Sequence, residues 1–135
     1  MSHRIALVGG TGPEGRGLAT RFAMAGHHVT IGSRGAERGT EVAAELAQSL
    51  KTTAPGATTI EGTDNATAVA DADLVVVVVP YAAHQPTLEG LRDALAGKIV
   101  VDAVVPVYFE RGPRPVEVEA GSATEEAAQL LPDSR

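Results

Sequence analysis

The residues best suited to bind a ligand form a glycine-rich turn near the start of the chain. The apolar segment Arg4–Val8 leads into Gly10-Thr11-Gly12-Pro13-Glu14-Gly15, which has Gly-x-Gly-x-x-Gly spacing. In this pattern Gly10 lets the chain turn off a strand, Gly12 lets backbone approach a pyrophosphate, and Gly15 lets a helix pack closely. A helix beginning here directs free N–H groups at phosphates. The order of strand, glycines and helix predicts a dinucleotide site; an ordinary glycine-rich turn is the alternative.

The end of the second expected strand indicates which dinucleotide is bound. His27–Ile31 has a strand pattern and leads to Ser33 and Arg34, with Arg38 four residues further on. NAD-binding chains carry an acidic residue about 20 positions after the glycines, where it holds the ribose 2′-hydroxyl. A hydroxyl and a guanidinium would instead bind a 2′-phosphate through charge-assisted hydrogen bonds. We therefore predict a preference for NADP(H), with Arg38 closing the other side of the phosphate; for a lone surface arginine, simple solvation is the alternative.

Composition excludes several other classes of function. The chain has 135 residues, 44% of them apolar, which suits a single NADP-binding domain over residues 1–135. Its net charge of -6 argues against nucleic acid or anionic membranes as partners. It has no cysteine, and its four histidines show no metal-ligand spacing. No signal peptide fits before the first strand, and no apolar run is long enough to span a bilayer, so we expect a cytoplasmic protein.

The rest of the sequence alternates strand-like and helix-like segments. Strands are expected at Arg4–Val8, His27–Ile31, Thr58–Glu61, Leu74–Val79 and Lys98–Asp102. Helices are expected at Pro13–Ala25, Ala36–Leu50, from an Asp64 N-cap to Ala70, Leu88–Leu95, and from a Ser122 capping box to Leu131, with a loop over Ala103–Gly121. The unalternating valines of Leu74–Val79 are typical of a parallel strand covered on both faces. This order predicts a doubly wound α/β fold of the Rossmann type, with a parallel sheet of strand order 3-2-1-4-5.

Three loops should meet at the carboxyl ends of the central strands, where such sheets bind ligands. They are Gly9–Gly15, Val79–His84 and Asp102–Pro106. Tyr81 is placed to pack beside a nicotinamide ring. His84 is either an acid or base, or a histidine near solvent at the start of a helix. Asp102 is interpreted as a carboxylate that caps its loop, with substrate contact as the alternative.

These motifs together resemble the coenzyme F420-dependent NADP oxidoreductases. The resemblance covers Ile5–Gly12, Gly15–Ala19, Gly32–Arg34, Val79–Tyr81, His84, Lys98–Val101 and Val105–Val107. It implies hydride transfer between NADPH and the deazaflavin F420. It also implies that Thr11, Ser33, Arg34 and Arg38 hold the 2′-phosphate, and that the Pro80-Tyr81 loop covers the nicotinamide, although the family often has Trp where this chain has Tyr81.

The resulting set of expected cofactor-binding residues contains no catalytic side chain and no metal ligand. It comprises Gly10, Thr11, Gly12, Pro13, Glu14, Gly15, Ser33, Arg34, Arg38, Val79, Pro80, Tyr81, His84, Val105 and Pro106. Members of the family are longer, and their C-terminal part supplies much of the deazaflavin pocket and the dimer contacts. We therefore expect a complete NADP half-site, an incomplete second half-site, and a homodimer or larger assembly formed through an exposed sheet edge. The alternatives are reduction of a flavin, a ferric chelate or a small carbonyl compound, and a non-catalytic NADP-binding or sensing domain.

Overall fold

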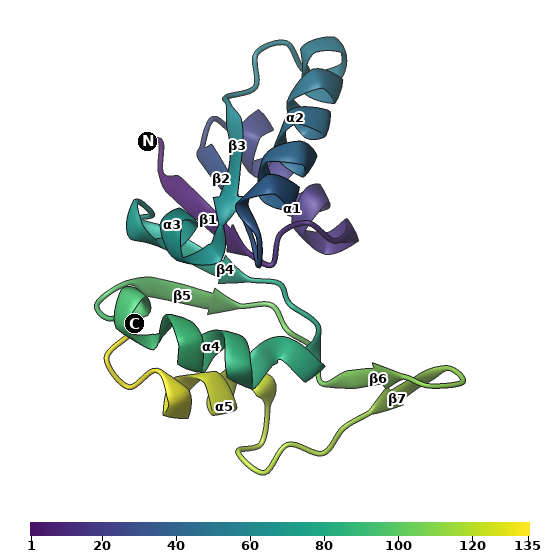
Figure 1. The fold of residues 1–135 in the computed structure, drawn as a ribbon, viewed down its shortest axis with the longest axis vertical. Helices are drawn as coiled ribbons and strands as arrows, with labels where there is room; N and C mark the ends of the chain where they lie inside the picture. Colours follow the sequence, from purple (N-terminus) through teal and green to yellow (C-terminus); the bar gives the residue numbers. More distant parts are fainter.

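A five-stranded parallel sheet forms the centre of the protein, whose computed structural model describes all of residues 1–135 (Figure 1). Its strands are β1 (Arg4–Val8), β2 (His28–Ser33), β3 (Ile60–Asp64), β4 (Leu74–Val77) and β5 (Ile99–Asp102). Their order is β3-β2-β1-β4-β5, and every neighbouring pair is parallel. The predicted Rossmann-type fold and strand order are therefore confirmed.

Helices cover both faces of this sheet. They are α1 (Pro13–Met24), α2 (Ala36–Thr53), α3 (Asn65–Ala70), α4 (Tyr81–Leu95) and α5 (Ala123–Leu130). One apolar cluster joins the sheet to α1 and α2, and a second joins it to α3, α4 and α5. Val76 and Val78 belong to the first cluster, whereas Val75 and Val77 belong to the second. Because successive side chains of a strand point to opposite faces, an unbroken run of valines supplies both clusters.

Helix α4 begins seven residues earlier than the predicted Leu88. It starts at Tyr81, directly after Pro80, and contains Pro86 in its second turn. Pro86 lies on the exposed face of the helix, as does Ala82, whose carbonyl loses its hydrogen-bond partner to the proline. The buried face holds the helix to the sheet through His84, Leu88, Leu91 and Leu95. Packing of this face outweighs the local preference against an internal proline.

The expected loop over Ala103–Gly121 contains a short antiparallel hairpin. Its strands are β6 (Val107–Phe109) and β7 (Pro113–Pro115), and the turn uses left-handed backbone at Arg111 and Gly112. Strand β7 has only one backbone N–H, that of Arg114, because its other two residues are prolines. A strand with two prolines has no strand pattern in the sequence, which explains the difference. Strand β3 also differs, running two to three residues later than predicted.

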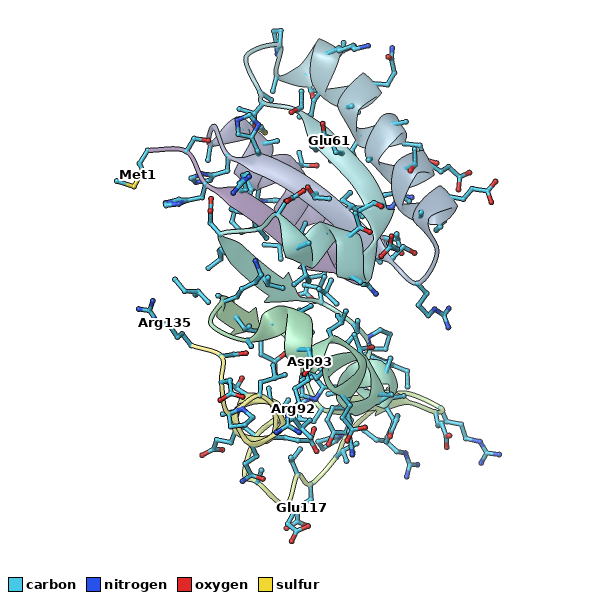
Figure 2. The ribbon with its side chains drawn as sticks, turned by 60° about the vertical axis from the view of Figure 1, so that its left-hand side comes forward. Met1, Glu61, Arg92, Asp93, Glu117 and Arg135 are labelled. Carbon is cyan, nitrogen blue, oxygen red and sulfur yellow. The ribbon has the colours of Figure 1, made fainter.

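The hairpin projects from the body of the molecule on the side opposite the two chain ends (Figure 1). In Figure 2, Met1 and Arg135 both lie on the left-hand side of the molecule, Met1 beside its upper part and Arg135 beside its lower part. The backbone N–H of Arg135 donates to Lys98 at 2.9 Å, and its carbonyl accepts from Val100 at 2.8 Å, so one residue pairs with the edge of β5. The side chains of Ile99 and Val101 on this strand remain exposed. None of the helices is both long and apolar enough to cross a membrane.

Candidate functional site

An open cavity of about 1220 Å³ lies at the carboxyl ends of the central strands. Strand order reverses between β1 and β4, and ligands of doubly wound sheets bind beside that point. Most of the predicted site residues line this cavity: Thr11, Gly12, Pro13, Glu14, Gly15, Ser33, Arg34, Arg38, Val79, Pro80, Tyr81 and Val105. Gly10, His84 and Pro106 do not line it. The three predicted loops thus meet around one space.

Each glycine of the turn is required for a different steric reason. The left-handed backbone falls at Gly9 (φ 72°) and not at Gly10, and a Cβ on Gly9 would overlap Val79. Gly10 is buried beneath the cavity, where a Cβ would meet Leu7 at 2.8 Å. A Cβ on Gly15 would overlap the backbone of Gly10, so its absence lets α1 pack against the turn.

Gly12 is the glycine that leaves space free. A Cβ built there would have no protein atom within 4 Å, and its backbone is extended (φ -80°, ψ 176°). Gly12 is also the N-cap of α1 and offers no side chain to the free N–H groups of the first turn, those of Glu14 and Gly15. The fold therefore leaves open backbone and unpaired donors at the same place, which suits an anion such as a pyrophosphate.

Arg16, which follows the turn, fixes its shape. Its Nε donates to the Thr11 carbonyl at 3.0 Å, and Nη1 pairs with Glu45 of α2 at 2.7 Å. Asn65, the first residue of α3, supports the turn from the other side, because its Oδ1 accepts from the Gly9 N–H at 3.1 Å. Sequence analysis missed Asn65; the only signal was its place directly after the Asp64 N-cap.

Asp64 itself performs the predicted cap. Its Oδ1 accepts from the Thr67 N–H at 2.9 Å, and its Oδ2 accepts from the Thr67 hydroxyl at 2.7 Å. These hydrogen bonds to the charged form lower the pKa of the Asp64 carboxyl below its usual 3.8. The cap thereby holds the start of α3, and with it Asn65, beside the glycine turn.

Polar and cationic side chains gather at one end of the cavity. Ser33 ends β2 and is buried, whereas Arg34 and Arg38 are exposed. Arg38 Nη1 pairs with Glu41 of the same helix at 2.5 Å, while Arg34 makes no ion pair. Arg34 is consequently the cation at this end that is not paired with a carboxylate.

The opposite end of the cavity is apolar and aromatic. Tyr81, at the start of α4, stacks on His84 with ring centroids 5.9 Å apart and meets Tyr108 edge-on at 6.1 Å. Val104, Val107 and Phe109 continue this wall, and Phe109 is 81% exposed. Burial, and then the negative charge of Glu126, raise the pKa of the Tyr81 hydroxyl above its usual 10.0. Tyr81 is thus a neutral ring at one wall of the cavity.

His84 lies behind this wall and is fully buried. The interpretation of His84 as a histidine near solvent is therefore wrong, because α4 begins early enough to turn His84 inward with Leu88. Its Nε2 lies 2.8 Å from Asp102 Oδ2, and its Nδ1 lies 2.9 Å from Glu126 Oε2. Asp102 Oδ1 also accepts from the Val104 N–H at 3.2 Å, which confirms the predicted loop cap. Pro106 faces the hairpin, where its carbonyl accepts from Val116.

The fold and the cavity together define a class of protein. A parallel sheet with reversed order at β1 and β4, a glycine turn under the cavity and a free helix N-terminus are the features of a Rossmann-type dinucleotide-binding fold. Residues 4–106 match the family model described as NADP oxidoreductase, coenzyme F420-dependent. The chain belongs to this family.

Individual relatives agree with the family model. The F420-dependent NADP reductase of Methanothermobacter thermautotrophicus is 41% identical over 97% of this chain, and that of Methanocaldococcus jannaschii is 35% identical over 98%. A crystal structure described as a candidate F420-dependent NADP reductase from Arthrobacter sp. FB24 superposes with a TM-score of 0.77 at 32% identity over 98% of the chain. The chain spans 56%, 60% and 59% of these three proteins, respectively.

Proposed function

We propose that the chain binds NADPH across the cavity and takes part in hydride transfer between NADPH and the deazaflavin F420. The observation that carries the proposal is the pairing of open backbone at Gly12 with the uncommitted guanidinium of Arg34 in one cavity. Membership in the F420-dependent family supports the choice of F420 as the second substrate. On this proposal residues 1–135 act as one NADP-binding domain.

The two ends of the cavity give the nucleotide a direction. The 2′-phosphate would accept hydrogen bonds from the Ser33 hydroxyl and the Arg34 guanidinium, with Arg38 and Thr11 beside them. The pyrophosphate would lie over Gly12, within reach of the first-turn N–H groups of α1. The nicotinamide would then extend toward Tyr81, because this ring lies at the other end of the same cavity.

In the proposed reaction the protein positions the two reacting rings and supplies no nucleophile. NADPH supplies the hydride, and the transfer needs the donor and acceptor atoms held about 3–3.5 Å apart. Tyr81, Val104 and Val107 would hold the nicotinamide on one side and keep water away. Phe109, exposed at the rim, offers a flat apolar surface to a second ring.

The second-substrate site, the assembly and the location stay predictions. The relatives named F420-dependent NADP reductase are longer than this chain. The F420 half-site is therefore proposed for the complete active enzyme. A homodimer is proposed because β5 leaves Ile99 and Val101 exposed on an edge strand. We also propose that the protein works in the cytoplasm.

Two measurements on one preparation test the function. NADPH and NADH are titrated separately, and the deazaflavin absorbance is followed when F420 and NADPH are mixed with the protein. The proposal expects tighter binding of NADPH than of NADH, and bleaching of F420 that depends on the protein. Equal affinity for the two nucleotides contradicts the NADP assignment. NADPH binding without turnover of F420, flavin, ferric chelate or carbonyl acceptors supports a non-catalytic binding domain instead.

A further inference from the structure

A buried cluster of three titratable side chains lies behind the aromatic wall of the cavity. His84 is 0% exposed, and its two ring nitrogens contact Asp102 Oδ2 at 2.8 Å and Glu126 Oε2 at 2.9 Å. The Asp102 side chain is 2% exposed and that of Glu126 24%. The three residues come from three different elements: α4, β5 and α5. Such burial of ionisable groups is costly unless each is paired.

Each of the two hydrogen bonds in the cluster needs a proton to share. An ionised carboxylate only accepts hydrogen bonds, whereas each ring nitrogen either donates or accepts. Two hydrogen bonds among three groups therefore require two protons, either both on the ring or one on the ring and one on a carboxyl group. The contacts that join the three side chains are the two hydrogen bonds of the His84 ring.

The same three residues connect the parts that form the aromatic wall. The His84 ring stacks on Tyr81, which lines the cavity. Asp102 accepts from the N–H of Val104, another residue of the wall. Glu126 attaches α5 to this arrangement and lies near Tyr81, where its charge contributes to the raised pKa of that hydroxyl. Tyr81 is therefore located by stacking on one buried cluster, and Val104 by a hydrogen bond that ends on the same cluster.

We propose that His84 is a positioning residue, which, through Asp102 and Glu126, holds Tyr81 and Val104 where they bind the nicotinamide half of NADPH. The inference rests on the proposed function, because it assigns the nicotinamide to this wall. It predicts that loss of the cluster weakens binding of the nicotinamide half of NADPH and leaves binding of the 2′-phosphate half unchanged.

The test compares two ligands on each variant of the full chain. NADPH contacts both ends of the cavity, whereas adenosine 2′,5′-bisphosphate contacts only the glycine turn and the Ser33-Arg34 end. Calorimetry gives both affinities, and the fluorescence of bound NADPH reports how firmly its ring is held. His84→Gln and Glu126→Leu are expected to weaken NADPH binding about tenfold and to reduce the fluorescence gain, with the affinity for the bisphosphate unchanged.

Glu126→Gln is the conservative variant. The amide of the new side chain can donate to His84 Nδ1 while His84 Nε2 donates to Asp102, so both hydrogen bonds are kept. The NADPH affinity of Glu126→Gln should therefore equal that of wild type. Val100→Ala is the matched control, because Val100 lies on β5 and packs on an apolar cluster of the same sheet face but makes none of the hydrogen bonds of His84. Its thermal stability should fall while the ratio of the two affinities stays unchanged.

Several results would overturn the proposal. If His84→Gln and Glu126→Leu weaken both ligands equally, or neither, His84 is only a core residue. If His84→Gln does not fold, the two Glu126 variants decide, since that side chain reaches partial exposure. If wild type binds the bisphosphate as tightly as NADPH, the wall contributes nothing to recognition, although the NADP preference can still hold. Failure of wild type to bind NADPH at all contradicts the proposed function itself.

Discussion

The two ends of the cavity are built in different ways. At the phosphate end, the glycine turn and the Ser33-Arg34 pair each stand at the end of a strand, and backbone geometry shapes the site. At the aromatic end, Tyr81, Val104 and Phe109 come from separate segments, and the first two contact the buried cluster of His84, Asp102 and Glu126. The phosphate end is therefore built from short segments and is open to solvent, whereas the aromatic end depends on tertiary packing. Substitutions at the two ends should fail in correspondingly different ways.

The largest effect is expected from Gly12→Val. A Cβ at Gly12 meets no protein atom but would occupy the space of the pyrophosphate, so nucleotide binding should be abolished while the fold remains. The stability cost should be about 1 kcal/mol, because valine is a poor N-cap. Calorimetry with NADPH and circular dichroism on the same sample measure both parts.

Gly15→Ala is the structural counterpart. Its Cβ would overlap the backbone of Gly10, and crowding of this kind costs about 1–3 kcal/mol. Thermal unfolding should therefore shift further for Gly15→Ala than for Gly12→Val. Retained NADPH affinity in Gly12→Val with a native spectrum would remove the glycine turn from the binding site.

A smaller but more specific effect is expected from Arg34→Asp. The variant should lose affinity for NADPH by roughly tenfold to a hundredfold, the value of a charge-assisted contact of about 1.5–3 kcal/mol, and should now prefer NADH. Arg92→Asp, at an exposed position on α4, changes the net charge equally and is the control. If both variants weaken NADPH to the same extent, the effect is a general one of charge and Arg34 has no special role.

A substitution at the aromatic end should affect F420 and leave the affinity for NADPH unchanged. Phe109→Ala removes an exposed ring that lines the cavity. We expect KM for F420 to rise by up to about tenfold, since an aromatic pair contributes about 0.5–1.5 kcal/mol, while the NADPH affinity stays unchanged. Glu110→Ala in the same hairpin is the control. Equal effects of the two changes on KM would contradict a stacking role for Phe109.

The contrast between the two ends also explains what the sequence could predict. The sheet order, the glycine turn and the Ser33-Arg34 pair follow from short patterns, in which neighbouring residues define the geometry. The burial of His84 could not be predicted in the same way. It depends on a helix that continues through Pro86, and on carboxylates 18 and 42 residues away. The hairpin carrying Phe109 was missed because β7 contains two prolines.

The smallest effect is expected at Asp64, which supports the phosphate end from the surface. Asp64→Asn keeps an N-cap for α3 but removes the charge that Thr67 stabilises. The folded pKa of Asp64 is lowered, so its carboxylate stabilises the fold above the usual value of 3.8, and this contribution disappears as pH falls through the folded pKa. Wild type should therefore be slightly more stable than Asp64→Asn near neutral pH, and the difference should vanish in acid. Urea unfolding at pH 7 and at successively lower pH measures it. A difference that persists at the acid end would mean that the shape of the cap, and not its charge, supports Asn65 and the glycine turn.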